Sequence, residues 1–289
     1  MEGRLCLDSR HLVRADLDRC DQTTQSAAER SPARRSRPGT DHARTATGAR
    51  HVTSLLVSVR SLAEAESAMR GDADVIDVKE PQRGPLGCAL PSTWHAVADI
   101  LPRATPLSIA LGELDSLDPM QLDFLPSRCV WAKVGLAQAE QGDWRAKLAA
   151  VDEALPAGVA LVPVAYADWR EVGAPAPRDI LEEAAVRGNV LLVDTFTKDG
   201  RSLFDWLEPV QVARLIRHCR TLAVQIALAG SLDASHLPAL RRMAPDWIAV
   251  RGAVCRGDRN GTVDRELVRR LRAAMSPARA APARLKAEG

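Results

Sequence analysis

Residues 54–87 read SLLVSVRSLAEAESAMRGDADVIDVKEPQRGPLG, and this stretch decides the fold. Two short apolar runs, residues 54–59 and 73–78, lie on either side of the amphipathic segment SLAEAESAMR at residues 61–70. Runs that are apolar on both faces, without strict alternation, are typical of parallel strands that are covered on both sides. The stretch therefore predicts a strand, a helix and a second strand parallel to the first.

The same alternation continues to residue 275. Further apolar runs of strand length occupy residues 106–111, 129–134, 160–166, 189–194, 221–229 and 247–251. Helical segments follow at residues 92–101, 145–155, 180–187, 210–220, 235–243 and 263–275. Local signals agree with these helices, because Pro91 suits a first helical turn and Asp233 can cap the helix that follows it.

Eight strands that alternate with helices can form an open sheet or a closed barrel. An open doubly wound sheet needs a reversal of strand order and usually has a glycine-rich first turn. The first turn here, SVRSLAEAE at residues 58–66, contains no glycine. The length of residues 52–275 is close to the roughly 250 residues of a (β/α)8 barrel. We therefore expect an α/β protein with a TIM (β/α)8 barrel as its catalytic domain at residues 52–275.

The two ends of the chain differ in composition from the predicted barrel. Residues 1–50 hold ten arginines among Ser, Thr and Ala, and they show no sustained apolar period. No apolar segment follows these charges, as a secretory signal would require, and several acidic residues argue against a transit peptide. We expect an Arg-rich leader at residues 1–51 that is disordered or wrongly assigned, and a disordered tail at residues 276–289.

Composition argues against several classes of protein. With 46% hydrophobic residues and a formal charge of +2, the chain reads as an ordinary soluble protein. Its 3% of aromatic residues is too few for a nucleic-acid surface built on base stacking, and no apolar stretch reaches the ~20 residues that span a bilayer. The six cysteines form no CxxC pair, which favours a reducing cytoplasm without a zinc site. We expect no nucleic-acid or membrane partner, and a homo-oligomer is compatible with the sequence.

Lysine is scarce in this chain, and its positions are unusual. Five lysines stand against 34 arginines, and Lys79, Lys133 and Lys198 lie at or just past the end of a predicted strand. Lysine is costly at the end of a buried strand, yet unlike arginine it can lose its proton. The pattern indicates a need for amines that can become neutral, although biased composition and chance would also place a single lysine there.

Carboxylates accompany these lysines at the carboxyl ends of the predicted strands, where barrel enzymes place their sites. Side chains two residues apart on a strand face the same way, so Asp77 and Lys79 share a direction. Buried ion pairs of Asp77 with Lys79 and of Asp194 with Lys198 are the structural alternative, but such pairs are weak evidence for stability. The cluster comprises Asp77 and Lys79 after the second strand, Glu113 and Asp115 after the third, Lys133 after the fourth, and Asp194 and Lys198 after the sixth.

The last two strands end in glycines. Loops seven and eight of such barrels form a phosphate-binding cup from backbone N–H groups, and an arginine adds a charged donor. We expect this cup to bind a phosphate through Gly230, Ser231, Arg251, Gly252 and Ala253. Arg83 and Gly84, in the loop after the second strand, offer a second anion contact or form only a surface turn.

Clustered lysines beside a phosphate cup favour Schiff-base chemistry on a carbonyl. A free lysine, with a pKa of ~10.4, is neutral in only about 4 of 10,000 molecules at pH 7. Burial and neighbouring ammonium groups that lower the pKa by ~3 units raise this fraction to roughly 30%. Nothing in the sequence indicates nicotinamide, flavin or a metal, so we expect no cofactor. The residues alone do not say which lysine is the nucleophile.

Five segments resemble the (5-formylfuran-3-yl)methyl phosphate synthase family, also called 4-(hydroxymethyl)-2-furancarboxaldehyde-phosphate synthase. They are residues 55–87, WAKVGL at 131–136, LLVDTFTKDGRSL at 191–203, ALAGSL at 227–232 and DWIAVRGAVC at 246–255. The resemblance covers about residues 53–274 and leaves out both ends. It implies a TIM-barrel lyase of methanofuran biosynthesis that joins two glyceraldehyde 3-phosphate molecules into a furan, with loss of one phosphate and two waters.

The resemblance also assigns roles to the predicted cluster. It implies that Lys79 forms the Schiff base with a triose phosphate and that Lys133 takes the proton. Asp77, Asp194 and Lys198 would assist proton transfer and the eliminations. Two other functions stay open on the residues: a different class I aldolase acting on a sugar phosphate, and a catalytically silent barrel that binds phosphate ligands.

Overall fold

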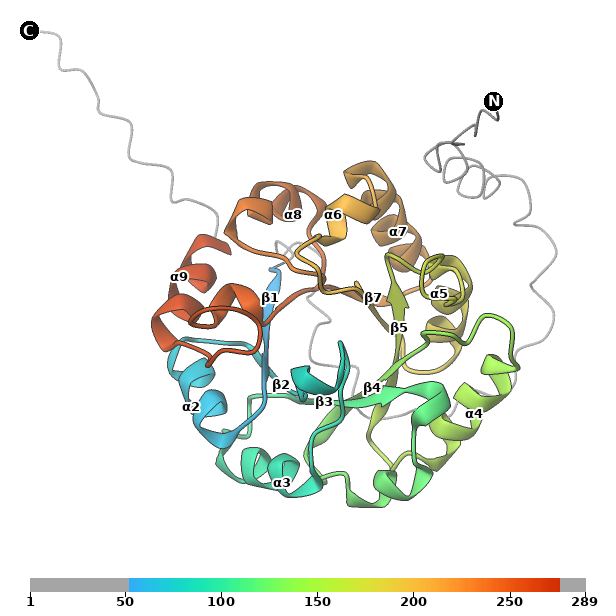
Figure 1. The fold of residues 1–289 in the computed structure, drawn as a ribbon, viewed down its shortest axis with the longest axis horizontal. Helices are drawn as coiled ribbons and strands as arrows, with labels where there is room; N and C mark the ends of the chain where they lie inside the picture. Colours follow the sequence, from blue (N-terminus) through green and yellow to red (C-terminus); the bar gives the residue numbers. More distant parts are fainter. Residues whose placement is uncertain (1–51, 276–289) are drawn as a thin grey trace, which may run out of the picture. The chain divides into compact units, whose positions relative to one another are not determined.

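Eight parallel strands close into a barrel in the computed structural model, which describes residues 52–275 (Figure 1). The strands pair in chain order, and β8 pairs with β1 to complete the ring. This confirms the predicted TIM barrel, whereas the predicted leader (1–51) and tail (276–289) lie outside the described residues. The strands are β1 (Ser54–Val59), β2 (Val75–Val78), β3 (Leu107–Glu113), β4 (Cys129–Gly135), β5 (Ala160–Tyr166), β6 (Val190–Asp194), β7 (Gln225–Leu228) and β8 (Trp247–Val250).

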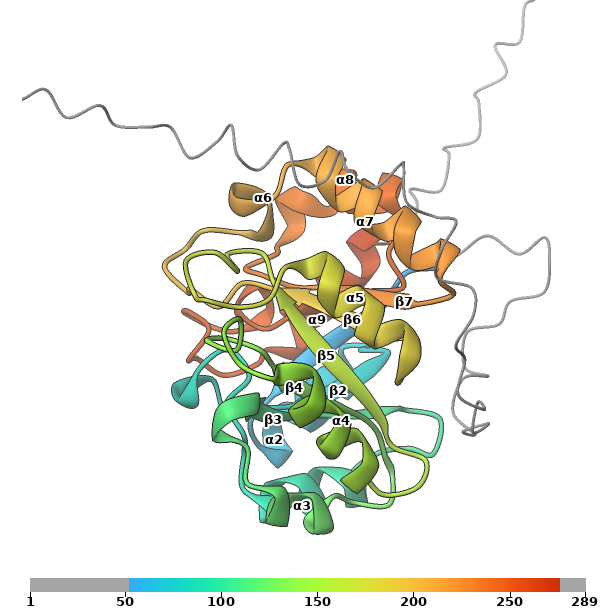
Figure 2. The same ribbon diagram turned by 90° about the vertical axis from the view of Figure 1, so that its right-hand side faces the viewer.

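Helices connect the strands and cover the outside of the barrel, as Figure 1 shows. In Figure 2, α5 lies against β5 and β6, which it contacts. Among residues 52–275, no helix is both long and apolar enough to cross a membrane. The helices are α2 (Leu62–Arg70), α3 (Pro91–Ile100), α4 (Trp144–Ala154), α5 (Pro177–Val186), α6 (Leu203–Trp206), α7 (Pro209–Thr221), α8 (Leu237–Met243) and α9 (Arg265–Met275).

The predicted helix starts agree with the structure, but one strand start does not. Pro91 is the first residue of α3, and the Asp233 side chain accepts a hydrogen bond from the Ser235 N–H at 2.9 Å. The strand predicted at 221–229 begins only at Gln225, because α7 continues to Thr221. The chain then turns through Ala223, whose φ of 54° lies in the left-handed region. The apolar residues between the end of α7 and Gln225 therefore belong to a turn and not to the strand.

Alternation of side chains along the strands gives the barrel an apolar floor and a polar mouth. Because side chains two residues apart share a direction, apolar Trp131 precedes Lys133 on β4, and Leu192 precedes Asp194 on β6. Trp131 and Leu192 belong to the apolar cluster inside the barrel, and Lys133 and Asp194 are also buried. The same strands therefore supply the packing below and the charged groups above.

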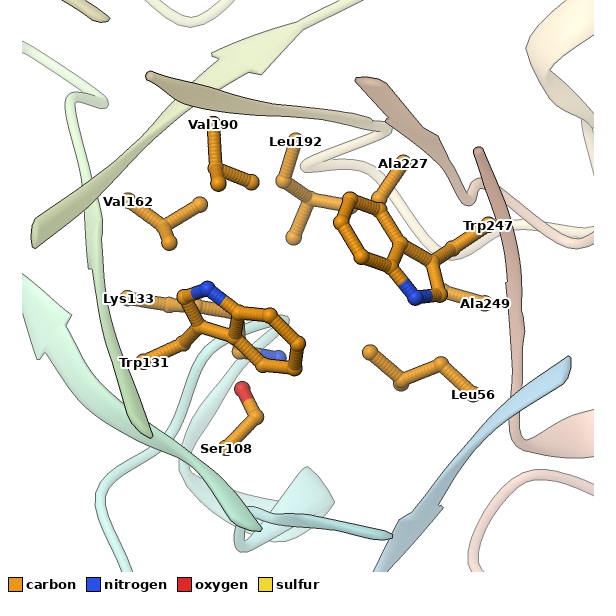
Figure 3. A pocket seen from close by; sticks show the side chains of 10 residues that line it. All are labelled: Leu56, Ser108, Trp131, Lys133, Val162, Val190, Leu192, Ala227, Trp247 and Ala249. Atoms are coloured by element: carbon orange, nitrogen blue, oxygen red, sulfur yellow. The ribbon is translucent and has the colours of Figure 1, made fainter. Parts of the chain in front are cut away.

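Two tryptophans fill the floor of the barrel. The rings of Trp131 and Trp247 meet edge to face with their centroids 5.2 Å apart, an arrangement that aromatic pairs favour. Leu56, Val162 and Leu192 surround them, as Figure 3 shows. The cavity left between these side chains is only about 20 Å³, so the floor is packed almost completely.

We expect Trp131→Ala to lower the free energy of unfolding by about 3–5 kcal/mol, because it removes a buried aromatic side chain and leaves a cavity. Urea denaturation followed by circular dichroism measures this change. Val186→Ala is the control, since Val186 is 72% exposed and should alter stability by less than about 0.5 kcal/mol. A loss below about 1 kcal/mol in Trp131→Ala would show that the floor does not hold the barrel together.

Candidate active site

Asp77 and Lys133 form a buried ion pair across the mouth of the barrel. The Lys133 Nζ lies 2.6 Å from Asp77 Oδ1, and both side chains are at most 5% exposed. Ser58, on β1, donates its hydroxyl to Asp77 Oδ2 at 2.8 Å. Residues of β1, β2 and β4 therefore meet here, and both oxygens of the carboxylate have partners. The carboxylate of Asp77 is therefore already paired with Lys133.

Asp194 and Lys198 form a second ion pair, as the sequence alternative proposed for these two residues. The Lys198 Nζ lies 2.7 Å from Asp194 Oδ1 and donates to Thr195 Oγ1 at 3.1 Å. Although burial disfavours the charged form of Asp194, the ammonium groups of Lys198 and Lys79 hold its pKa below the usual value. The carboxylate is thus ionised, with an amine already bound to it.

Asp168, which the sequence reading did not single out, fixes the loop that carries Lys198. It is 2% exposed and follows β5 by two residues. Its two carboxylate oxygens accept the N–H groups of Phe196 and Thr197 at 2.8 and 2.7 Å. Only the three-dimensional structure reveals this contact, because the residues lie far apart in the sequence.

Lys79 lies between these two pairs without a partner of its own. Within residues 52–275, its amine has no hydrogen bond or ion pair, and the residue is 8% exposed. Burial lowers the pKa of Lys79 to about 7, with the charges of Lys133 and Lys198 adding to this effect. Asp194 and Asp77 act in the opposite direction without restoring the ordinary value.

The ion pair of Asp77 with Lys79, considered from the sequence, is therefore wrong. Asp77 and Lys79 both lie in the mouth, as their spacing predicts. However, the ion-pair partner of Asp77 is Lys133, which lies on β4. A pairing across the barrel depends on strand register, which adjacent positions in the sequence do not reveal. The mouth therefore brings together all five of the residues predicted to be catalytic: Asp77, Lys79, Lys133, Asp194 and Lys198.

Glu113 and Tyr166 form a further polar pair at the mouth. The hydroxyl of Tyr166 donates to Glu113 Oε1 at 2.6 Å, and the N–H of Ala137 donates to Oε2 at 3.0 Å. Burial raises the pKa of Glu113, and the Asp194 charge acts in the same direction. The sequence reading missed Tyr166, although it is the single tyrosine of the chain and lies at a strand end. Asp115 does not join this pair, because it binds the exposed Lys147 at 2.6 Å.

The glycine-containing ends of β7 and β8 lie on neighbouring strands, as predicted. Gly230 has a φ of +96°, and a Cβ at this position would lie 3.0 Å from Thr195 Cγ2. Within the described residues, the N–H groups of Gly230, Ser231, Gly252 and Ala253 have no acceptor. Gly252 and Ala253 begin the 3-10 turn η7 (Gly252–Val254). These four N–H groups are available to bind an anion.

Arg251 does not serve as the charged donor of this cup. Its side chain is 4% exposed and forms an ion pair with Glu64 at 2.8 Å. Its remaining N–H groups donate to the backbone carbonyls of Ser58, Arg259 and Gly261. The sequence correctly predicted Arg251 at the end of β8, but it could not show that Arg251 forms an ion pair with Glu64 on α2. Arg259, which the sequence reading missed, is half-buried and interacts electrostatically with Asp194.

Within residues 52–275, no three His, Cys, Asp or Glu side chains are arranged to hold a metal ion. The mouth presents amines, carboxylates, a phenol and backbone N–H groups. Fold and site together define a (β/α)8-barrel protein with a buried, unpaired lysine amine near two ion pairs, and with four backbone N–H groups that have no acceptor at the ends of β7 and β8.

Comparison with known proteins identifies the family. A profile of the 4-HFC-P synthase family matches residues 55–272. The chain is 34% identical over 234 residues to the (5-formylfuran-3-yl)methyl phosphate synthase of Methanopyrus kandleri, covering 77% of this chain and 98% of that protein. It is 33% identical over 230 residues to the Methanocaldococcus jannaschii synthase of the same name, covering 75% and 97%. The chain therefore belongs to the 4-HFC-P synthase family.

Solved structures show the same fold at much lower identity. A 3-hexulose-6-phosphate synthase aligns with a TM-score of 0.54 and 16% identity, covering 78% of this chain and 100% of that one. A phosphoribosyl anthranilate isomerase aligns with a TM-score of 0.53 and 12% identity, covering 78% and 98%. At these identities the likeness concerns the barrel alone.

We expect Lys79→Met to stabilise the protein in a pH-dependent manner. A lysine whose folded-state pKa of about 7 is below its unfolded value of 10.5 destabilises the fold fully below pH 7, and this cost disappears as the pH rises to 10.5. The stability gained by the variant should therefore fall by about 1.4 kcal/mol per pH unit over this window. Urea denaturation at pH 7, 8 and 9 measures it. A gain that is constant with pH would contradict the lowered pKa of Lys79.

Proposed function

We propose that this protein condenses two glyceraldehyde 3-phosphate molecules into (5-formylfuran-3-yl)methyl phosphate, with release of one phosphate and two waters. Membership of the 4-HFC-P synthase family supports the overall reaction. The observation that carries the mechanism is the unpaired amine of Lys79, with a pKa of about 7. The reaction would take place in the cytoplasm, as a step in the biosynthesis of a methanofuran-type cofactor for one-carbon metabolism.

Lys79 is the nucleophile in this mechanism. With a pKa of about 7, about half of its amines are neutral at pH 7, so a lone pair is available to attack a triose phosphate carbonyl. Loss of water then gives an iminium, which acidifies the adjacent C–H bond. Arginine could not take this role because its guanidinium does not lose a proton.

The two ion pairs are the proton-transfer groups. Lys133, charged in its pair with Asp77, would first donate its proton to the hydroxyl group that leaves as water when the iminium forms. The neutral amine then takes the proton from the α-carbon, and Asp77, 2.6 Å from its Nζ, stabilises the ammonium that is restored. Lys198 and Asp194, held at 2.7 Å, also interact electrostatically with Lys79 and would assist the eliminations of water and phosphate. A paired amine can deliver and recover a proton without leaving a buried charge uncompensated.

The N–H cup of Gly230, Ser231, Gly252 and Ala253 would hold the phosphate of the molecule bound to Lys79. Backbone donors orient a phosphate without titrating, so binding there would not depend on the protonation of the lysines. Arg251 supports this cup indirectly, since its guanidinium ties the residue 259–261 backbone to β1.

We expect borohydride to trap a reduced triose phosphate adduct on the peptide that contains Lys79. Lys79→Arg keeps a basic side chain but cannot form the imine, so the adduct should disappear in this variant. Lys147→Arg, which changes an exposed lysine, is the matched control and should retain the adduct. Peptide mass spectrometry measures both. A wild-type protein without any adduct would favour a silent phosphate-binding barrel, and an adduct on another lysine would contradict the role of Lys79.

Mass spectrometry of the product distinguishes the proposed reaction from a sugar-phosphate aldolase. With glyceraldehyde 3-phosphate as the sole substrate, we expect a furan aldehyde monophosphate together with one inorganic phosphate per product molecule. An aldolase would instead give a bisphosphate whose mass is the sum of the two triose phosphates. The bisphosphate as the final product, without phosphate release, would overturn the proposed condensation.

A further inference from the structure

A second cavity lies beside the lysine cluster. It has a volume of about 290 Å³ and is formed by the loops after β2 and β3 together with Phe196 from the loop after β6. Its walls combine apolar side chains such as Leu86 and Leu111 with polar ones such as Arg83 and Glu113. Sites for drug-sized ligands begin at roughly 300 Å³, so this volume suits a smaller molecule.

The loop that follows Lys79 builds one wall of this cavity. The N–H of Glu80 donates to the Gly87 carbonyl at 2.7 Å, which closes the loop at its base directly after Lys79. At Gly87, a Cβ would lie 2.1 Å from the Glu80 carbonyl oxygen, so only glycine allows this closure. The cavity wall and the proposed nucleophile thus belong to one rigid segment.

Arg83 gives the cavity a positive charge that the protein itself leaves largely unused. Its Nη1 donates to the Cys88 carbonyl at 3.2 Å, and within residues 52–275 its guanidinium has no carboxylate partner. Arg259 reaches the same loop, because its Nη2 donates to the Gly84 carbonyl at 3.4 Å. A guanidinium with free N–H groups is well suited to a phosphate.

Glu113 and Tyr166 lie where the cavity meets the lysine cluster. Glu113 lines the cavity, and its carboxyl group is close enough to Asp194 to interact with it electrostatically. Phe196, another wall residue, packs edge to face on Tyr166 with ring centroids 5.4 Å apart. The Glu113–Tyr166 pair therefore places polar groups at this boundary, where they can meet the polar end of a bound molecule.

We propose that this cavity binds the second phosphorylated aldehyde of the reaction, with its phosphate on Arg83 and its carbonyl end towards Glu113. The proposal rests on the proposed function, which requires two phosphorylated molecules, whereas the N–H cup at β7 and β8 serves one. The cavity and the cup lie on different loops of the mouth, so two phosphates would be held apart while their carbon chains meet near Lys79.

The test separates adduct formation on Lys79 from condensation. Arg83→Ala, Arg83→Lys and the exposed control Arg103→Ala are compared with the wild type. Borohydride trapping gives the triose phosphate concentration for half-maximal adduct on Lys79, and furan production gives the concentration for half-maximal rate. We expect Arg83→Ala to raise the half-maximal concentration for furan production at least ~10-fold. The half-maximal concentration for adduct formation on Lys79 should change less than ~2-fold. Arg83→Lys should recover part of the loss because it keeps the charge, and Arg103→Ala should match the wild type.

Two results would overturn the second subsite. One is an unchanged half-maximal concentration for furan production in Arg83→Ala, and the other is an equal increase of both concentrations, which would place Arg83 on the molecule bound to Lys79. Absence of both adduct and furan in the wild type is a different outcome, because it removes the proposed function and the second subsite with it. Thermal unfolding of each variant shows that the exposed side chain is not needed for folding.

Discussion

Two of the three lysines at the mouth of this barrel are paired with carboxylates, and the site depends on the third, which has no such partner. Asp77 is bound by Lys133 and Asp194 by Lys198, each at less than 3 Å. The third amine, Lys79, is buried with no partner among residues 52–275. A buried charge without a partner is costly, so the neutral amine is favoured and its pKa falls to about 7. The two ion pairs matter less for stability than for withholding their carboxylates from Lys79.

The barrel makes this arrangement by simple geometry. Inward-facing positions recur every second residue, so β4 and β6 each contribute a floor residue (Trp131, Leu192) and, two positions later, a mouth residue (Lys133, Asp194). Trp131 and Trp247 close the floor with their edge-to-face contact. This packing keeps water away from the lysine cluster from below. The low polarity beneath the charged groups is part of the reason that burial dominates the pKa of Lys79.

Periodicity in the sequence was sufficient to predict the barrel, and strand ends were sufficient to predict the five lysines and aspartates that meet at the mouth. Asp115, which was predicted with them, binds the exposed Lys147 instead. What the sequence could not predict was partner choice. Asp77 lies on β2 and Lys79 follows directly after this strand, yet Asp77 pairs with Lys133 on β4, because β2, β3 and β4 are staggered across the ring. The position of Arg251 at the end of β8 was likewise predicted correctly, but its partner, Glu64 on the outer helix α2, was not. Long-range contacts of this kind leave no local pattern in a single sequence.

The positions of Tyr166 and Arg259 in the sequence already pointed to the mouth of the barrel. Tyr166 is the single tyrosine of the chain and ends β5, as the lysines end theirs. The segment GDRNGT at residues 257–262, which carries Arg259, also follows a strand end closely. No sequence pattern indicated the cavity beside Arg83. Its walls come from the loop after β2, the end of β3 with the loop that follows it, and the loop after β6, which only the closed barrel brings together.

The protonation of Lys79 can be observed directly. With lysine carrying a ¹⁵N label at its side-chain nitrogen, NMR spectra recorded across pH 5–11 follow each amine, and comparison with Lys79→Arg assigns the signal of Lys79. We predict that this signal titrates near pH 7, well below the ordinary lysine value of 10.5. Titration of Lys79 near its ordinary value of 10.5 would mean that the amine stays charged at neutral pH, and the account of the site given above would be wrong.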